Sequence, residues 1–210
     1  QATGREYWNY VMSYFSSMSS PGLAILPTHR LLSSFPLPEA RLLRQRLEQY
    51  FDIEECPPTS PENAGQLLER LENSNASSSF IIHAGNFENP LRLTLKPENA
   101  DEILGSLPSS LAELDVSVLQ QLVFTHILGI SPADMEKQRY TRYTQDAAEA
   151  LAAIASGSAQ VAVLLKGTRI DQVSEVARQG EKMPQKSTFF YPKLATGLLI
   201  SRLDLNFEEQ

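Results

Sequence analysis

The chain has 210 residues, of which 42% are hydrophobic, so it is long enough to bury a sizeable core in one domain. Its formal net charge of −7 argues against a nucleic-acid partner, because proteins that neutralise phosphates broadly present a strongly basic face. The single cysteine, Cys56, excludes an intramolecular disulfide, and no apolar run reaches the ~18 residues of a membrane span. We therefore expect one domain over residues 1–210, located in the cytoplasm, with no membrane or nucleic-acid partner and no metal site.

The first half of the chain predicts hairpins and amphipathic helices. Residues 10–18 and 22–32 are rich in β-forming side chains and are separated by Ser19-Ser20-Pro21-Gly22, so they predict two strands joined by a tight turn. The elements expected next are a helix over 38–51, a strand over 51–56, a helix capped by Ser60, and a hairpin formed by strands 80–85 and 91–96.

The second half predicts an alternation of helices and strands. Residues 115–130 predict a helix with Asp115 as its N-cap, and the unbroken apolar run 161–165 predicts a central strand that is covered on both faces. The other elements expected are strand 140–143, helix 146–156, strand 159–167, helix 170–179 and strand 196–203. The fold class is therefore α+β, with a mixed sheet flanked by helices.

The segment "GEKMPQKSTFFYPK", residues 180–193, is the first candidate site. Lysines and hydroxyl groups are the side chains that a phosphate or carboxylate needs, and the aromatic side chains could stack against the rest of a ligand. The alternative is a proline-bounded loop whose aromatic side chains fill the core while its lysines stay in solvent. With Thr28, which lies elsewhere in the chain, the candidate anion-binding residues are Thr28, Lys182, Lys186, Ser187, Thr188, Tyr191 and Lys193.

The same segment comes within one residue of a phosphate-loop motif but does not fit its structural context. A phosphate loop follows a strand and opens a helix, whose free N–H groups hold the phosphates. Here a helix is expected before the segment, Pro184 removes one N–H donor, and the residues after Ser187 are poor helix formers. We therefore reject a phosphate loop.

The sequence "PTHR", residues 27–30, is the second candidate site. His29 and Arg30 end an apolar run, and an imidazole beside a guanidinium suits proton transfer or contact with an anion, which makes these two the candidate catalytic residues. The alternative is that Arg30 pairs with a carboxylate and His29 is structural. His83 and His126 lie inside apolar elements, so we expect both to be structural.

Two separated stretches, "YVMSYFSSMSSPGLAILPTHRLL" and "GEKMPQKSTFFYPKLATGLLI", resemble a bacterial and archaeal family known as domain of unknown function one thousand and fifteen. The stretches "DVSVLQQLVFTHILGI" and "VAVLLKGTRIDQVSEVA" are similar to it as well, so the resemblance covers most of the chain. Members of this family carry an upstream Asp-Gly-His-His-Arg stretch that resembles a motif of ParB-like proteins and of an ADP-dependent serine kinase. That stretch does not occur in this sequence.

The resemblance implies that the chain is the C-terminal half of a longer protein. The first hypothesis is a phosphotransfer protein in which this half forms one wall of an anion-binding cleft, with Lys186, Ser187, Thr188 and Lys193 at the phosphate and His29 and Arg30 assisting. A nucleotide is the candidate cofactor, a small phosphorylated molecule is the candidate ligand, and any phosphotransferase activity would need the upstream half.

The second hypothesis is a non-catalytic assembly domain, in which the proline-aromatic segment docks the upstream half or a second copy of the chain. Placement of the cations distinguishes the two. Convergence of His29, Arg30, Lys186 and Lys193 on one concave surface favours the binding site, whereas scattered cations and outward-facing aromatic side chains favour the interface.

Overall fold

The structure is a computed structural model that describes residues 9–20, 22–58, 60–74 and 78–200. Residues 25–189 form one compact unit, and the described residues before and after this range belong to a second unit. No helix among the described residues is long and apolar enough to cross a membrane.

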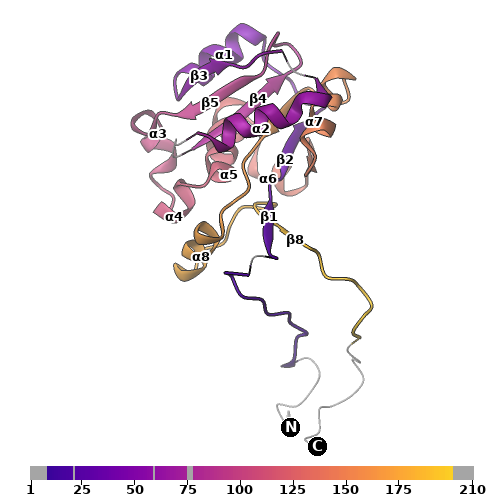
Figure 1. Cartoon of the computed structure of the whole chain (residues 1–210). Coiled ribbons are helices and arrows are strands. Elements are labelled where there is room, and N and C mark those ends of the chain that lie inside the picture. Colours follow the sequence, from indigo (N-terminus) through magenta and orange to yellow (C-terminus); the bar gives the residue numbers. More distant parts are fainter. Residues whose placement is uncertain (1–8, 21, 59, 75–77, 201–210) are drawn as a thin grey trace, which may run out of the picture. The chain divides into compact units, whose positions relative to one another are not determined.

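Residues 25–189 are built around a sheet whose six described strands lie in the order β3-β5-β4-β7-β2-β6 (Figure 1). Every neighbouring pair in this sheet is antiparallel. Two further strands, β1 (Ala24–Leu26) and β8 (Phe189–Tyr191), form a sheet of two strands. The strands of the larger sheet are β2 (His29–Leu32), β3 (Phe51–Glu55), β4 (Ser79–Ala84), β5 (Leu91–Leu95), β6 (Thr141–Thr144) and β7 (Val161–Leu164).

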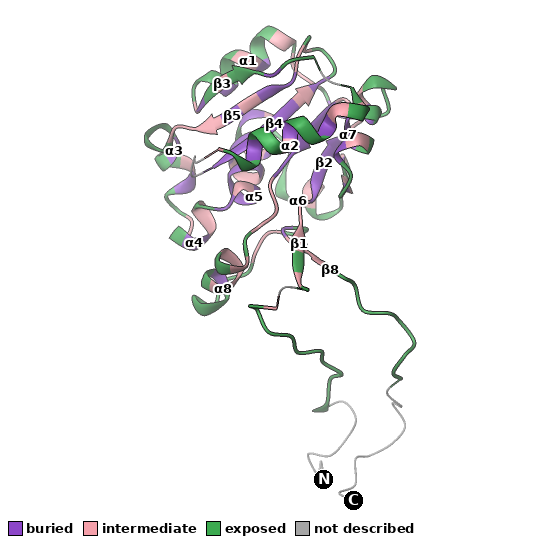
Figure 2. Ribbon diagram, viewed as in Figure 1, coloured by how far each residue is buried: buried purple, intermediate pink, exposed green. Residues whose placement is uncertain are grey.

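Helices cover both faces of this sheet, and alternate strand residues pack into two separate cores. Leu31 and Ile81 face a core with α2 and α7, whereas Leu32 and Ile82 face a core with α1, α3 and the π-helix η3. The buried residues concentrate along β2, β4 and β7, and the outer sides of the helices are exposed (Figure 2). The helices are α1 (Ala40–Glu48), η2 (Pro61–Asn63), α2 (Ala64–Glu72), α3 (Pro97–Leu104), α4 (Ser109–Ala112), α5 (Asp115–Val118), η3 (Leu119–Ile127), α6 (Pro132–Glu136), α7 (Ala147–Ala155) and α8 (Ile170–Arg178).

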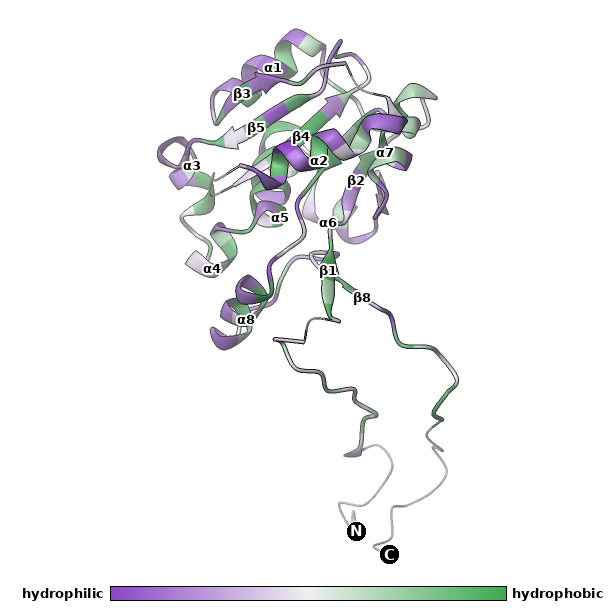
Figure 3. Cartoon of the chain, in the orientation of Figure 1, coloured by the Kyte–Doolittle hydropathy of each residue, from purple (hydrophilic) through white to green (hydrophobic). Residues whose placement is uncertain are grey.

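The predictions that rest on hydrophobic patterns are confirmed for the elements that form these two cores. β4 and β5 form the predicted hairpin, and β7 is fully buried between β4 and β2, as its unbroken apolar run predicts. Figure 3 shows the concentration of hydrophobic residues along β4. The predicted α+β class with a helix-flanked sheet is confirmed, although the sheet is antiparallel at each pairing rather than mixed.

Several predicted elements differ in the structure. Residues 10–18 and 196–200 are not strands, and 201–203 lie outside the described residues. β-forming side chains favour a strand only where a partner and a half-buried surface exist, and Phe15 is 90% exposed. The strand predicted over 22–32 is interrupted between β1 and β2, at Pro27 and Thr28, because proline lacks the N–H that a ladder needs.

The helix predicted over 115–130 is present but differs in its start and its winding. It begins as α5 and continues as the π-helix η3, and Leu114 takes the N-cap position that the sequence assigns to Asp115. The Asp115 carboxylate instead accepts a hydrogen bond from the Ser79 N–H, at 3.3 Å. The short helices α3, α4 and α6 were not predicted, although Pro97 and Pro132 provide the usual signal of a first helical turn.

Gly167, just after β7, should be sensitive to substitution. A Cβ atom at this position would lie 2.5 Å from the carbonyl oxygen of Ile25, a backbone atom that cannot easily move. We expect Gly167→Ala to lower the free energy of unfolding by about 1–3 kcal/mol, the usual cost of overpacking. Urea denaturation would measure this change.

Gly65 provides the matched control. It lies in α2 with nothing within 4 Å of an added Cβ atom, so Gly65→Ala should stabilise the protein by ~0.5–1 kcal/mol. Equal effects of the two substitutions would contradict the close approach at Gly167.

Candidate functional site

β2 directs His29 and Arg30 to opposite faces of the sheet. Successive residues of a strand point in opposite directions, and here Leu32, on the side of Arg30, packs with η3, whereas Leu31, on the side of His29, packs with α7. Both polar residues are deeply buried. The structure therefore does not bring the imidazole and the guanidinium together at one site.

His29 has the environment of a structural residue. Its Nδ1 atom accepts a hydrogen bond from the Leu165 N–H at 3.2 Å, and its Nε2 atom finds no partner among the described residues. Burial, together with the nearby charge of Arg30, lowers the pKa of His29 to about 4. The ring is therefore neutral at pH 7, and its proton lies on Nε2 because Nδ1 accepts a hydrogen bond.

Arg30 is a buried cation on the opposite face of the sheet. Its guanidinium donates hydrogen bonds to the carbonyl oxygens of Thr28 and Lys186, the latter at 3.1 Å, and lies 5.6 Å from the centre of the Tyr143 ring. Burial lowers the pKa of Arg30 to about 10, so the group stays protonated at neutral pH. No carboxylate within the described ranges forms an ion pair with it, and a buried charge without a counter-ion is costly.

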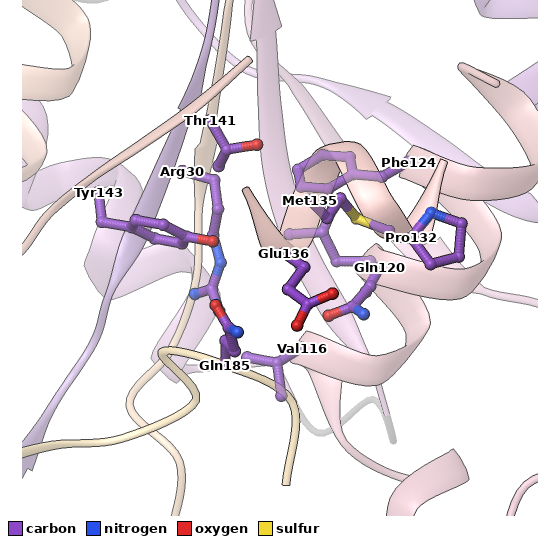
Figure 4. Close-up of a pocket in the computed structure, with 11 residues that line it drawn as sticks. Arg30, Val116, Gln120, Phe124, Pro132, Met135, Glu136, Thr141, Tyr143 and Gln185 are labelled. Atoms are coloured by element: carbon purple, nitrogen blue, oxygen red, sulfur yellow. The ribbon is translucent and has the colours of Figure 1, made fainter. Parts of the chain in front are cut away.

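A cavity of about 100 Å³ lies against Arg30. Figure 4 shows Arg30, Tyr143 and Gln185 on one side of this cavity, with Gln120, Glu136 and Met135 on the other. We call it the Arg30 pocket. Its apolar walls include Val116, Phe124 and Met135, and its polar walls include Thr141, Gln120 and Gln185.

A larger cavity of about 400 Å³ brings together three of the candidate anion-binding residues. Thr28 comes from the start of β2, whereas Lys186 and Thr188 come from the segment before β8. Arg142 adds a second cation, and we call this space the Lys186 cavity. Thr141 and Tyr143 line both cavities, so the two are neighbours across β6.

The other candidate anion-binding residues lie elsewhere. The Ser187 hydroxyl is buried and donates to the Pro184 carbonyl at 2.6 Å, so it holds the shape of its own loop. Lys182 is exposed and lines neither cavity. Tyr191 and Lys193 belong to the second unit, outside the residues that form the cavities.

Sequence reasoning missed the contribution of β6, "TRYT" at 141–144. In the pairing of β2 with β6, Tyr143 lies directly opposite Arg30. Because side chains alternate along a strand, Thr141 and Tyr143 both lie on the same face of the sheet as Arg30. The sequence of β6 is a short run of β-forming residues that contains an arginine. Nothing in that run indicates that the strand lies beside β2. Within the described residues, no group of three or more His, Cys, Asp or Glu side chains could hold a metal ion.

A third cavity, of about 390 Å³, adjoins the Arg30 pocket across Val116. Lys166 and Asp115 line it and form an ion pair at 3.8 Å. Burial raises the pKa of Asp115, and the charge of Lys166 opposes that shift. These two charges compensate each other, and the Arg169 guanidinium, which also lines this cavity, is paired with Asp171 at 2.9 Å.

Comparison with known proteins identifies the family of the chain. Residues 1–117 match the family model described as "Protein of unknown function (DUF1015)", and the chain therefore belongs to this family. Among functionally curated proteins none matches it.

One solved structure with similarity is a mutant of a free serine kinase in complex with AMP. It is 14% identical, with a TM-score of 0.46, and the match covers 83% of this chain and 56% of that chain. The present chain thus spans little more than half the length of that protein. Similarity at this level supports no conclusion about activity.

The buried, neutral state of His29 predicts a loss of stability in acid. The unfolded chain takes up a proton near pH 6.5, whereas the folded protein does so only near pH 4, so the unfolded state binds more protons between these values. The contribution to stability is complete above pH 6.5. It should be lost as the pH falls toward 4, by on the order of 3 kcal/mol in total.

Urea denaturation between pH 7.5 and 4.5 would measure this slope. His29→Asn retains an acceptor for the Leu165 N–H but cannot titrate, so its stability should depend less steeply on pH than that of the unmodified chain. His126→Asn, which makes the same substitution at an exposed position, is the matched control. Identical slopes for all three proteins would rule out the assigned state of His29.

Proposed function

We propose that this chain provides one wall of an anion-binding cleft in a nucleotide- or phosphate-binding phosphotransfer protein. The observation that carries the proposal is the joint placement of Thr28, Lys186 and Thr188 in one cavity, beside a buried arginine that has no carboxylate partner within the described residues. The half that the family resemblance implies upstream would complete the cleft and the reaction.

The electrostatics of the two neighbouring cavities support an anionic ligand. Lys186 and Arg142 contribute two cations to the larger cavity, and Arg30 contributes a third to the pocket next to it. The net charge of the whole chain is −7, so this concentration of positive charge is local. A local cluster attracts a small anion without creating the broad basic face that nucleic acids need.

The chemistry available here is binding and charge stabilisation. Phosphoryl transfer depends mainly on positioning the phosphates and stabilising their negative charge, which lysine and arginine side chains accomplish. His29 cannot act as a general base in this site, because its ring lies on the other face of the sheet. Any group that accepts a proton from the acceptor substrate would therefore come from other residues.

A non-catalytic assembly role is the second candidate, and the exposed apolar residues of the second unit favour it. Val11, Phe15 and Ile200 are 84%, 90% and 84% exposed, and large apolar side chains exposed in series usually mark an interaction surface. In this role the segments 10–18 and 194–200 would dock the upstream half or a second copy of the chain.

Anion binding is tested by thermal unfolding of the 210-residue chain with ADP, ATP, pyrophosphate or phosphoserine. A ligand that binds only the folded state at a hundredfold excess over its Kd should stabilise it by about 2.7 kcal/mol, and so raise the Tm. Lys186→Ala and Arg142→Ala should each reduce this rise. Lys182→Ala is the matched control, because Lys182 is exposed outside both cavities.

The result decides between clear alternatives. A dose-dependent rise in Tm that Lys182→Ala preserves and Lys186→Ala reduces supports the anion site. No rise with any of the four ligands would overturn it.

The assembly role predicts self-association that depends on the exposed apolar residues. Sedimentation velocity from 5 to about 200 µM should then show a concentration-dependent increase in mass, because burying apolar surface drives association. Phe15→Ser should weaken that association at least about tenfold, whereas Lys182→Ser, also exposed, should not. A monomer at every concentration would exclude the second copy as the docking partner.

A further inference from the structure

We infer that the Arg30 pocket is a subsite for a single tetrahedral oxyanion, the terminal phosphoryl group of a phosphomonoester. The remainder of such a ligand would occupy the Lys186 cavity. This inference rests on the proposed function and specifies which kind of phosphate compound the site accepts.

The charge of Arg30 is the first reason. Arg30 is only 5% exposed. Its hydrogen bonds to the carbonyl oxygens of Thr28 and Lys186 use two of the five guanidinium N–H groups. The remaining donors have no acceptor among the described residues, and the guanidinium borders the cavity. A phosphoryl group would supply both the missing acceptors and the missing negative charge.

The number of other donors favours four oxygens over two. The Thr141 hydroxyl is buried, finds no hydrogen-bond partner in the part of the chain that the structure describes, and lines the same pocket. The amides of Gln120 and Gln185 border the pocket as well (Figure 4). Together with the guanidinium, these groups offer more donors than the two oxygens of a carboxylate can accept.

The size of the pocket limits what can enter it. Its volume of about 100 Å³ corresponds to roughly three water molecules at ~30 Å³ each, enough for one phosphoryl group but far below the ~300 Å³ of a typical ligand site. The apolar side chains of Val116, Phe124 and Met135 lower the local dielectric constant below that of water. The attraction between the guanidinium and a phosphoryl oxygen is therefore stronger here than in water.

The neighbouring cavity explains how a larger molecule could use this pocket. Thr141 and Tyr143 line both spaces, and in the inferred complex the ester oxygen of a phosphoryl group beside Arg30 lies on the side of the Lys186 cavity. That cavity, at about 400 Å³, is large enough for the organic part or for further phosphates. A phosphodiester should bind less tightly, because its second ester group replaces one of the charged oxygens that Arg30 and Thr141 would contact.

The charge of Glu136 allows the direction of a change in binding affinity to be predicted. This exposed carboxylate reaches toward the pocket opposite Arg30, where it would repel a phosphoryl dianion (Figure 4). Removing its charge should therefore strengthen binding, whereas removing the charge of Arg30 should weaken it. A pocket whose only role is to hold α6 in place would show neither change in affinity.

The test is a calorimetric titration of the 210-residue chain at pH 7.5 with methyl phosphate, dimethyl phosphate and acetate. Methyl phosphate should bind at least about tenfold more tightly than either of the other two, since only it has a terminal phosphoryl group. Arg30→Gln should weaken methyl phosphate binding at least about tenfold, and Thr141→Val by about threefold. Glu136→Gln should tighten it about two- to fivefold.

Two further measurements separate this inference from the proposed function. Lys186→Ala should leave the affinity for methyl phosphate within about twofold and weaken pyrophosphate, which extends into the larger cavity. If pyrophosphate binding depends on Lys186 but methyl phosphate does not bind, or binds independently of Arg30, the subsite is wrong and the proposed function stands. If no anion binds, both are wrong.

Folding of the variants is verified by far-ultraviolet circular dichroism. Should Arg30→Gln fail to fold, Thr141→Val and Glu136→Gln still decide, because one removes a hydroxyl without changing size and the other changes a surface group. Acetate binding as tight as that of methyl phosphate would overturn the assignment to a phosphoryl group.

Discussion

The buried guanidinium of Arg30 is the interaction on which the arrangement of the site depends. It joins three separate parts of the chain, because it donates to the carbonyl oxygens of Thr28 and Lys186 and lies against the ring of Tyr143. Carbonyl oxygens satisfy donors but carry only partial charge, so they do not neutralise a buried cation. The contacts that hold the backbone at Lys186 therefore leave the positive charge of Arg30 unneutralised at the wall of a cavity.

The alternation of the central sheet gives neighbouring polar residues different surroundings. On one face, α2 and α7 cover an apolar core, where His29 is neutral and bonded to the backbone of β7. On the other face, Arg30 lies at the end of the second core, beside η3 and α6, whose residues line its pocket. Two adjacent residues thus lie in different surroundings, because a strand directs them to opposite sides.

The cavities beside this sheet share lining residues and differ in their electrostatics. The Lys186 cavity and the Arg30 pocket share Thr141 and Tyr143, and the pocket in turn shares Val116 with the cavity that contains Asp115 and Lys166. The first two contain cations without carboxylate partners in the described residues, whereas the third contains an ion pair. The family model covers residues 1–117, which include Thr28 and Arg30 but not Lys186.

The sequence by itself determined the helices and strands whose hydrophobic pattern indicates which side chains are buried. These include the hairpin of β4 and β5 and the central position of β7. It also identified Arg30, Lys186, Thr28 and Thr188 as candidates, because cations and hydroxyl groups concentrate in two short segments. Only the tertiary structure decided that β6 lies beside β2, that His29 points away from Arg30, and that Ser187 supports its own loop. The pairing of β2 with β6 joins residues more than a hundred positions apart, and side-chain composition alone does not specify such pairing. The other two outcomes are local, but they depend on where the strand and the loop begin and end.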